Sequence, residues 1–206
     1  LIHPSINPGL TEKEIRTELE NFMFSNGADS LAFGSIVASG PNTANPHAVP
    51  SDRVVQRGDF VLMVYGAGYC DYRSDMTRTV VVGEPTPEQL DLYALVRRTH
   101  EECAAAVHAG VEGNDIFKLS RKIIGDAGYG DYYNHGLGHG VGIDIHEMPN
   151  FNRSMNIIEA GSVITIEPGV YLPGIGGVRL EDYGVVTEDG YEPFTKSSHE
   201  LQVIDC

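Results

Sequence analysis

Basic side chains are scarce in this sequence. Its 206 residues include 14 lysines and arginines against 29 acidic residues, which gives a formal net charge of -15 at pH 7. Nucleic acid and anionic membrane surfaces repel a protein with this charge, so both are excluded as expected partners. The sequence also lacks any apolar run close to the roughly 18–20 residues that cross a bilayer, which argues against a membrane-spanning protein.

Cysteine is scarce too. Cys70, Cys103 and Cys206 form an odd set without CxxC spacing, which argues against a disulfide framework and against a thiolate zinc site. This usage is typical of a reducing compartment, and we predict a cytoplasmic location. An initiator methionine is missing and residues 1–10 do not read as a signal peptide, so we expect the chain to begin partway into a longer product or after a cleavage.

Length and composition indicate a folded globular protein with a sizeable core, since 41% of the residues are hydrophobic and 21% are charged. Capping residues and apolar periodicity predict helices over residues 11–27, 86–110 and about 114–124. Runs rich in β-branched residues predict strands over residues 31–39, 60–65, 75–82, 163–167 and 178–186. The mixture, with strand pairs that resemble antiparallel hairpins, predicts an α+β fold.

The chain repeats itself weakly but in order. Residues 9–15 resemble 110–116, His47-x-x-Pro50 resembles His146-x-x-Pro149, and residues 58–64 resemble 161–167, at offsets of about 100 residues. Three matches in order predict two similar halves that face each other across a cleft. The alternative is coincidence among turns rich in glycine and valine.

The densest chemistry lies in HGLGHGVGIDIHE, residues 135–147, where three histidines and four glycines fall within twelve residues. Glycine lets the backbone approach a ligand or another strand closely. Histidine is a common metal ligand and titrates near neutrality. The combination is not typical of a core and predicts a functional site.

Three carboxylates stand alone in apolar strand segments: Asp75, Glu167 and Glu181. A carboxylate on a mostly buried strand must be paired, hydrogen-bonded or bound to a metal. Ion pairs of Glu181 with Arg179 and of Asp75 with Arg78 are the structural alternatives. Together with a histidine, the three carboxylates form an oxygen-rich ligand set that suits manganese, iron, cobalt or zinc.

The motif HGLGHGVGIDIHE resembles the signature of the Xaa-Pro dipeptidase, aminopeptidase P and creatinase family, which is related to methionine aminopeptidase. ITIEPGVY, GGVRLED and SDMTRT resemble its other metal-site segments, and NPHAVPS resembles its substrate-binding histidine segment. The resemblance covers essentially the whole chain. It implies the pita-bread fold, with two pseudo-symmetric halves around a mixed, largely antiparallel sheet and outer helices. We expect residues 1–206 to be the catalytic domain alone, without the family's N-terminal domain.

The resemblance also implies the roles of individual residues, because the family's peptidases hold two divalent metals with five side chains. The implied metal ligands are Asp75, His139, Glu167 and Glu181, and the implied substrate-binding residues are His47, His135, His146 and Arg179. His47 and His146 would stabilise the tetrahedral intermediate, and Glu167 would transfer the proton.

One ligand of the family pattern is missing. The family has an aspartate eleven residues before the position of Asp75, and this chain has Val64 there. Asp71 is a poor substitute because it lies about 13 Å from Asp75 along an extended strand, and we expect it in a solvated turn. We therefore predict one divalent metal, with manganese, cobalt, iron or zinc as candidates, and a second site that is weakened or lost.

We accordingly predict a metal-dependent hydrolase with reduced activity on small peptides that carry proline in the second position, and we expect a homodimer. One alternative is a catalytically dead member that acts in binding or assembly, and another is a creatinase-like hydrolase or a lyase that uses the same pocket. An engineered substitution at Val64 is a further alternative.

The remaining histidines have ordinary interpretations. We expect His100 and His108 to face solvent on the second helix, and His3 and His199 to lie at the surface near the ends. Cys103 falls in an alanine-rich helical segment, so we expect it to be buried and inert.

Overall fold

The computed structural model of the protein describes residues 6–152 and 155–205. These residues contain three α-helices, at Glu12–Ser25 (α1), Pro87–Ala106 (α2) and Gly113–Asp126 (α3). Two 3-10 helices lie at Gly40–Ala44 (η2) and Gly130–Tyr132 (η3). None of the helices in these ranges is long and apolar enough to cross a membrane.

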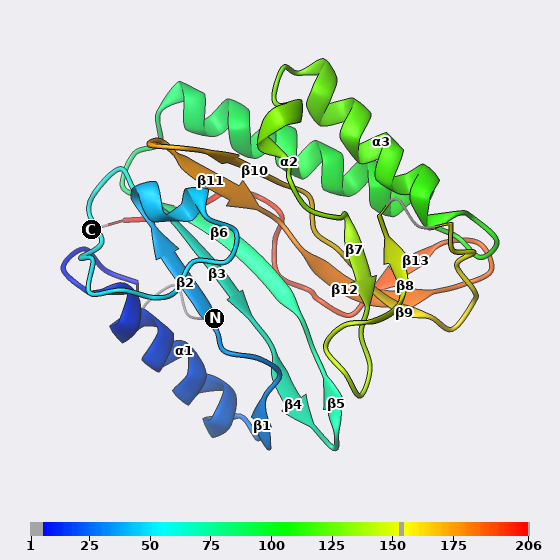
Figure 1. The fold of residues 1–206 in the computed structure, drawn as a ribbon. Coiled ribbons are helices and arrows are strands. Elements are labelled where there is room, and N and C mark those ends of the chain that lie inside the picture. The colour runs from blue at the N-terminus through cyan, green and yellow to red at the C-terminus, as the bar shows by residue number, and fades with distance from the viewer. Residues whose placement is uncertain (1–5, 153–154, 206) are drawn as a thin grey trace.

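Two main sheets form the centre of the molecule (Figure 1). The first has the order β14-β6-β3-β2, with strands at Gln202–Ile204, Met76–Val82, Phe60–Tyr65 and Ile36–Ser39. The second has the order β13-β12-β9-β7-β8, with strands at Tyr191–Pro193, Asp182–Val186, Val163–Ile166, Gly138–Gly140 and Glu147–Phe151. An isolated antiparallel bridge between Thr77 and Glu181 joins the two sheets.

Two smaller sheets complete the strand inventory of the described residues. One is a hairpin of β10 and β11, at Gly169–Leu172 and Gly176–Arg179. The other contains β1, β4 and β5, at Ser30–Leu31, Ala67–Tyr69 and Tyr72–Arg73. The turn between β4 and β5 places Cys70 and Asp71 at positive φ angles of 48° and 68°. Asp71 is exposed, as the sequence predicted.

The internal repeat corresponds to a repeated strand order. In the first sheet β3 lies between β2 and β6, and in the second β9 lies between β7 and β12. The central strand pairs antiparallel with its partner in both sheets, β3 with β6 and β9 with β12. The α+β fold and the two similar halves, both predicted from the sequence, are confirmed.

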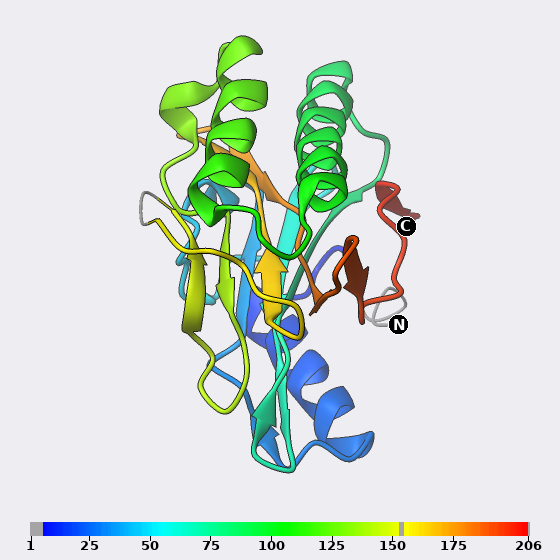
Figure 2. The same cartoon turned by 90° about the vertical axis from the view of Figure 1, so that its right-hand side faces the viewer.

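Alternation along β3 explains how the first sheet is covered on both sides. Val61 and Met63 join Ile15 and Leu19 of α1 in one core cluster, while Phe60 joins residues of α2 in another. Successive side chains of a strand point to opposite faces, so the even-numbered residues of β3 point away from α1. Figures 1 and 2 show α1 apart from the layer of α2 and α3.

The helix starts agree with the sequence signals. Thr11 with Glu14 and Thr86 with Gln89 each form a complete capping box, in which both side-chain bonds are present. The predicted end of the second helix at residue 110 was wrong, because Val107 is extended at φ −79° and ψ 130°. After this turn, Gly110 donates its backbone N–H to Ile158, so the chain leaves the helix in order to pair with the second half.

Two predicted strands are interrupted. The run over residues 31–39 divides into β1 and β2, and the run over residues 178–186 divides into β11 and β12. The second interruption leaves Glu181 between strands, where its backbone N–H donates to the carbonyl oxygen of Thr77. This interruption places a carboxylate at the junction of the two sheets.

Candidate metal centre and substrate cleft

A cleft of about 450 Å³ opens where the strands of the two halves meet. All of the site residues expected from the sequence lie along its wall: His47, Val64, Asp75, His135, His139, His146, Glu167, Arg179 and Glu181. They span 134 residues of the sequence, from His47 to Glu181. The structure therefore brings the expected set together in one cavity.

Strand ends position the three carboxylates. Asp75 immediately precedes β6, Glu167 immediately follows β9, and Glu181 occupies the interruption between β11 and β12. At such positions the backbone leaves the regular ladder, so a side chain from a buried strand reaches the edge of the sheet. The carboxylates consequently converge on the cleft instead of alternating across a sheet.

The convergence is close enough for shared ligation. Nε2 of His139 lies 3.7 Å from Oδ2 of Asp75 and 3.5 Å from Oε1 of Glu167. One candidate ligand atom from each of Asp75, His139 and Glu181 lies within 4.8 Å of the other two. These separations are typical of donors that surround one cation.

His139 is held in the tautomer that a metal requires. Its Nδ1 lies 3.0 Å from the carbonyl oxygen of Gly140, and because a carbonyl only accepts, Nδ1 carries the proton. Nε2 therefore presents a lone pair toward Asp75 and Glu167. Burial lowers the pKa of His139, which keeps the ring neutral and able to bind a metal.

Arg179 balances only part of the charge of the three carboxylates. Oδ1 of Asp75 and Oε1 of Glu181 are buried without a hydrogen-bond partner among the described residues. Burial, followed by the charges of Glu181 and Glu167, raises the pKa of Asp75 to about 10. Burial also raises the pKa values of Glu167 and Glu181. The donor set therefore fits a divalent cation, which would satisfy the free oxygens and neutralise the repulsion.

Thr77 is a site residue to which the sequence analysis assigned no role. Its hydroxyl donates to Oε2 of Glu181 at 2.5 Å and accepts from Nε of Arg179 at 3.0 Å. It thereby fixes the orientation of both side chains. The motif SDMTRT contains this threonine, but only the bridge between the sheets places it against Glu181.

Glycines flanking His139 let neighbouring strands approach the site closely. A Cβ atom on Gly138 would lie 2.0 Å from the backbone oxygen of Thr165, and one on Gly140 would lie 2.4 Å from that of Met148. No side chain fits at either position, because real Cβ contacts are not that short. The glycines of the motif therefore serve strand packing around the metal ligand.

Val64 contributes an apolar surface to the cleft. It is 5% exposed and packs with Leu62 and Tyr171, and its cross-strand neighbour in β6 is Thr77. Asp71 lies in the exposed turn beyond β4. The acid closest in sequence to Asp75 is thus held away from the cleft.

The histidines of the cleft differ in their surroundings. His47 and His146 are exposed on its wall, and the ring of His146 lies 4.4 Å from that of His139. His135 is more enclosed, with Nδ1 2.6 Å from the carbonyl oxygen of Gly136 and Nε2 2.8 Å from Oη of Tyr171. Burial lowers the pKa of His135 to about 4, so its ring is neutral.

The ion-pair alternatives for the carboxylates were wrong in their partners. Arg78 pairs with Asp182 at 2.7 Å, not with Asp75. Arg179 has Glu167 as its ion-pair partner, at 3.9 Å, not Glu181. Neither arginine therefore pairs with the acid that lies nearest to it in the sequence.

The expectation that His100 faces solvent was wrong. His100 is only 1% exposed, and burial lowers its pKa to about 4. His199 is partly buried, and its Nε2 lies 2.6 Å from Oδ2 of Asp182. His108 is exposed as expected, although it lies beyond the end of α2. His3 falls outside the described residues.

Cys103 is completely buried, as the sequence predicted. Burial, together with the nearby charge of Glu102, raises the pKa of its thiol to about 12. The thiol is therefore protonated and unreactive at neutral pH.

Comparison with known proteins shows the family to which the chain is related. The sequence pattern of metallopeptidase family M24 matches residues 2–188. The Xaa-Pro dipeptidase of Pyrococcus furiosus is 43% identical over 197 residues, which are 95% of this chain and 57% of that protein. The solved Xaa-Pro dipeptidase from Bacillus anthracis is 45% identical, with a TM-score of 0.95 over 98% of this chain and 57% of its own. The X-Pro aminopeptidase from Thermotoga maritima is 38% identical, with a TM-score of 0.96 over 98% and 57%.

The chain spans a little over half the length of these relatives. Within that span, the likeness extends over nearly all of its own residues in both sequence and structure. The family resemblance and the pita-bread fold are confirmed. The chain belongs to metallopeptidase family M24.

Proposed function

We propose that this chain is the catalytic domain of a peptidase that cleaves the bond before a proline in the second position, and that it works with one divalent metal. The names of its relatives, Xaa-Pro dipeptidase and X-Pro aminopeptidase, support the substrate class. Asp75, His139, Glu167 and Glu181 would hold the metal. We expect its peptidase activity to be lower than that of a two-metal relative, because Val64 supplies no donor atom for a metal.

The observation that carries this proposal is the pair of unpartnered oxygens on Asp75 and Glu181. Leaving an ionised carboxylate buried without compensation is strongly unfavourable. Both oxygens belong to the same cluster as the free Nε2 lone pair of His139. A cation at this point satisfies all three groups at once.

Val64 limits the number of metals. Hard divalent cations bind about six oxygen or nitrogen donors. Val64 lines the cleft with two methyl groups at the position where a second ion would need a carboxylate ligand. A second ion would have to share Asp75 and Glu181 with the first without a ligand of its own. We therefore propose one firmly held ion.

A divalent metal supplies a Lewis acid that polarises a carbonyl and lowers the pKa of water. The chain's own groups would do the rest. Glu167 has a raised pKa because of its burial, so it would hold and release the proton. His47 and His146 are exposed on the cleft wall, where they would donate hydrogen bonds to the developing oxyanion. Arg179, oriented by Thr77, would fix Glu167.

The finer parts of the proposal come from the resemblance or from composition. They are the choice among manganese, cobalt, iron and zinc, the homodimer, and the cytoplasmic location. An inactive binding or assembly role and a creatinase-like or lyase chemistry remain the alternative functions for the same cleft.

The test compares the protein with the Val64→Asp and Val64→Asn variants. Anomalous diffraction from Mn²⁺-loaded crystals counts the ions in the cleft, and hydrolysis of Ala-Pro and Met-Pro measures activity. We expect one ion in the original protein and two in Val64→Asp, with an increase in rate of about 100-fold. Asparagine has the shape of aspartate without its charge, so Val64→Asn should gain neither the ion nor the rate.

Each other outcome points elsewhere. Two ions in the unmodified cleft would refute the single-metal proposal. An unchanged rate in Val64→Asp, despite a second ion, would show that Val64 does not limit activity. If neither the unmodified protein nor Val64→Asp hydrolysed any Xaa-Pro peptide, the binding role would be favoured. A product other than the free amino acids would favour a different chemistry.

A further inference from the structure

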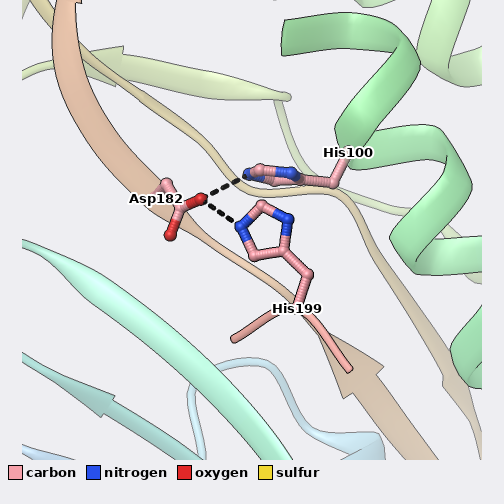
Figure 3. Close-up of side chains that lie close together, drawn as sticks. All are labelled: His100, Asp182 and His199. Atoms are coloured by element: carbon pink, nitrogen blue, oxygen red, sulfur yellow. Dashed lines mark hydrogen bonds and ion pairs between the residues drawn. The ribbon is translucent and has the colours of Figure 1, made fainter. Parts of the chain in front are cut away.

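A second group of ligand-type side chains lies close together around Asp182, the residue that follows the cleft carboxylate Glu181 (Figure 3). It contains His100 of α2, Asp182 at the start of β12, and His199 from the segment before β14. One candidate ligand atom from each residue lies within 4.8 Å of the other two. The group joins a helix, a sheet and the C-terminal segment, and the proposed peptidase reaction uses none of its members.

His100 is the unexplained member of this group. Its side chain is 2% exposed, and neither ring nitrogen has a hydrogen-bond partner among the described residues. Buried polar groups are nearly always hydrogen-bonded, because an unmade bond costs about 1–3 kcal/mol. Figure 3 shows one of its nitrogens directed toward Asp182, but Nε2 stays 3.6 Å from Oδ2.

Asp182 divides its two oxygens between different partners. Oδ1 accepts from Nη2 of Arg78 at 2.7 Å, while Oδ2 faces His199 at 2.6 Å and His100 at 3.6 Å. Arg78 thus fixes the carboxylate through Oδ1 and leaves Oδ2 directed toward both imidazoles. A carboxylate held in this way by a further side chain is the usual arrangement around a metal ligand.

The separations suit a small cation. In a tetrahedral zinc site with bonds of about 2.0–2.1 Å, donor atoms lie about 3.3 Å apart. The two measured separations, 3.6 Å and 2.6 Å, fall on either side of this value. Shifts of about 1 Å in the two histidine side chains would bring all three donors to one ion. The ion would take the place of the hydrogen atom in the bond between His199 and Asp182.

We propose that His100, Asp182 and His199 form a second metal site, which binds a zinc-type divalent transition metal. Two imidazoles and one carboxylate favour zinc over magnesium or calcium, which prefer oxygen donors. The side chain of His199 is 29% exposed, so an ion and a water ligand reach the site from solvent. Oε1 of Glu101 lies 3.7 Å from Nδ1 of His199 and 2.8 Å from Nε of Arg97.

The bound metal would anchor the C-terminal segment that contains His199 and β14. His199 lies three residues before β14, which pairs in parallel with β6 at the edge of the first sheet. Apart from this pairing, the segment is held by contacts such as the bond from Oη of Tyr93 to the carbonyl oxygen of His199, at 3.1 Å. Metal ligation would fasten it to α2 and β12, next to Glu181.

Zinc stoichiometry tests the proposal, measured by equilibrium dialysis against Zn²⁺. We expect His199→Ala to bind about one zinc fewer per chain than the unmodified protein. His139→Ala, which removes a ligand of the cleft, should keep the zinc that depends on His199, and the double variant should lose both. His108→Ala replaces an exposed histidine outside either group and should change nothing.

Hydrogen exchange and diffraction supply readouts that do not depend on stoichiometry. Zinc should slow amide exchange over residues 198–204 in the unmodified protein and in His139→Ala, but not in His199→Ala. Anomalous diffraction at the zinc edge should place an ion between the three side chains. Because His199 is partly exposed, its replacement by alanine or glutamine should leave the fold intact, which circular dichroism would verify.

Equal zinc binding by the unmodified protein and His199→Ala would overturn the proposal, as would a zinc-loaded crystal without a peak at this place. In either case the group would be only a hydrogen-bonded network. Loss of all zinc from His139→Ala would overturn it as well. None of these results concerns the ions counted in the cleft with Mn²⁺, so failure here is distinguishable from failure of the proposed function.

Discussion

The buried ion pair between Arg78 and Asp182 joins β6 of the first sheet to β12 of the second. Breaking it tests how much this contact stabilises the fold. Its nitrogen and oxygen are 2.7 Å apart, and the two side chains are 8% and 2% exposed. Arg78 also donates to the backbone oxygens of Thr77 at 2.9 Å and Glu181 at 2.6 Å. The Arg78→Met variant would remove these three bonds and a fourth, from Arg78 to the backbone oxygen of Ser197 at 3.2 Å, and it would leave the buried carboxylate of Asp182 without its arginine counter-charge.

The expected loss of stability is large because the site is buried. Removing one partner of a buried ion pair costs about 3–5 kcal/mol. For a domain of this size, each kcal/mol lowers the melting temperature by about 2–4 °C, so Arg78→Met should melt about 6–20 °C lower. The double variant Arg78→Met/Asp182→Leu removes both charges, so it should be more stable than the sum of the single losses predicts.

The assay is urea denaturation of the four proteins of this double-mutant cycle, with EDTA present so that no bound cation contributes. Lys13→Met is the control, because Lys13 and Asp52 form a pair of similar length, 2.9 Å, whose side chains are 49% and 83% exposed. Such an exposed pair contributes about 1 kcal/mol or less. The reasoning would be refuted if Arg78→Met lost no more stability than this control, or if the cycle were additive within about 0.5 kcal/mol.

Two further predictions concern the metal centre. Gly138→Ala should destabilise the protein and weaken Mn²⁺ binding at least about tenfold, because the new Cβ would meet Thr165 at 2.0 Å and displace His139; urea denaturation and Mn²⁺ titration would measure both effects. The metal-free protein should lose stability as pH rises from about 7 toward 10. Burial and the charge of Glu181 raise the pKa of Asp75 to about 10, above its unfolded value of about 3.9, so the folded state binds more protons across this range. Below about pH 7 the lowered pKa values of His100 and His135 act in the opposite direction. Denaturation midpoints at about pH 7 to 9 would show the slope.

Each of these two predictions has a control and a result that would contradict it. Gly125 has open space around its would-be Cβ, so Gly125→Ala serves as the matched control, and equal Mn²⁺ affinity in both alanine variants would contradict the packing argument. For the pH prediction, saturating Mn²⁺ should flatten or reverse the slope. A metal-free protein whose stability rises between about pH 7 and 9 would show that the buried carboxylates do not repel one another.

Local signals in the sequence accounted for much of the fold. The capping boxes at Thr11 and Thr86 place both helix starts, because the bonds involved span only three residues. The strand over residues 60–65 was predicted with its observed bounds, since an apolar run rich in valine has few other solutions. The helix end at Ala106 was missed because a long-range bond, from Gly110 to Ile158, determines where the chain leaves the helix.

The composition of the cleft was predictable, but its pairing was not. The ionisable residues that line it stand out in the sequence as isolated carboxylates, as a histidine and glycine cluster, and as matches to a family pattern. Proximity in the sequence predicts the wrong partners for Arg78 and Arg179, because residues that are close in the chain are not always close in the fold. The role of Thr77 depends on a bridge to Glu181 across 104 residues.

The sequence by itself determined the family, the α+β class and the presence of Val64 where an aspartate was expected, because these depend on residue identity and short-range pattern. Only the tertiary structure decided that Asp75 and Glu181 keep unpartnered oxygens. It also decided that His100 is buried beside Asp182 and His199. The physical reason is that burial and partnership depend on contacts between segments far apart in the chain, which no local pattern encodes.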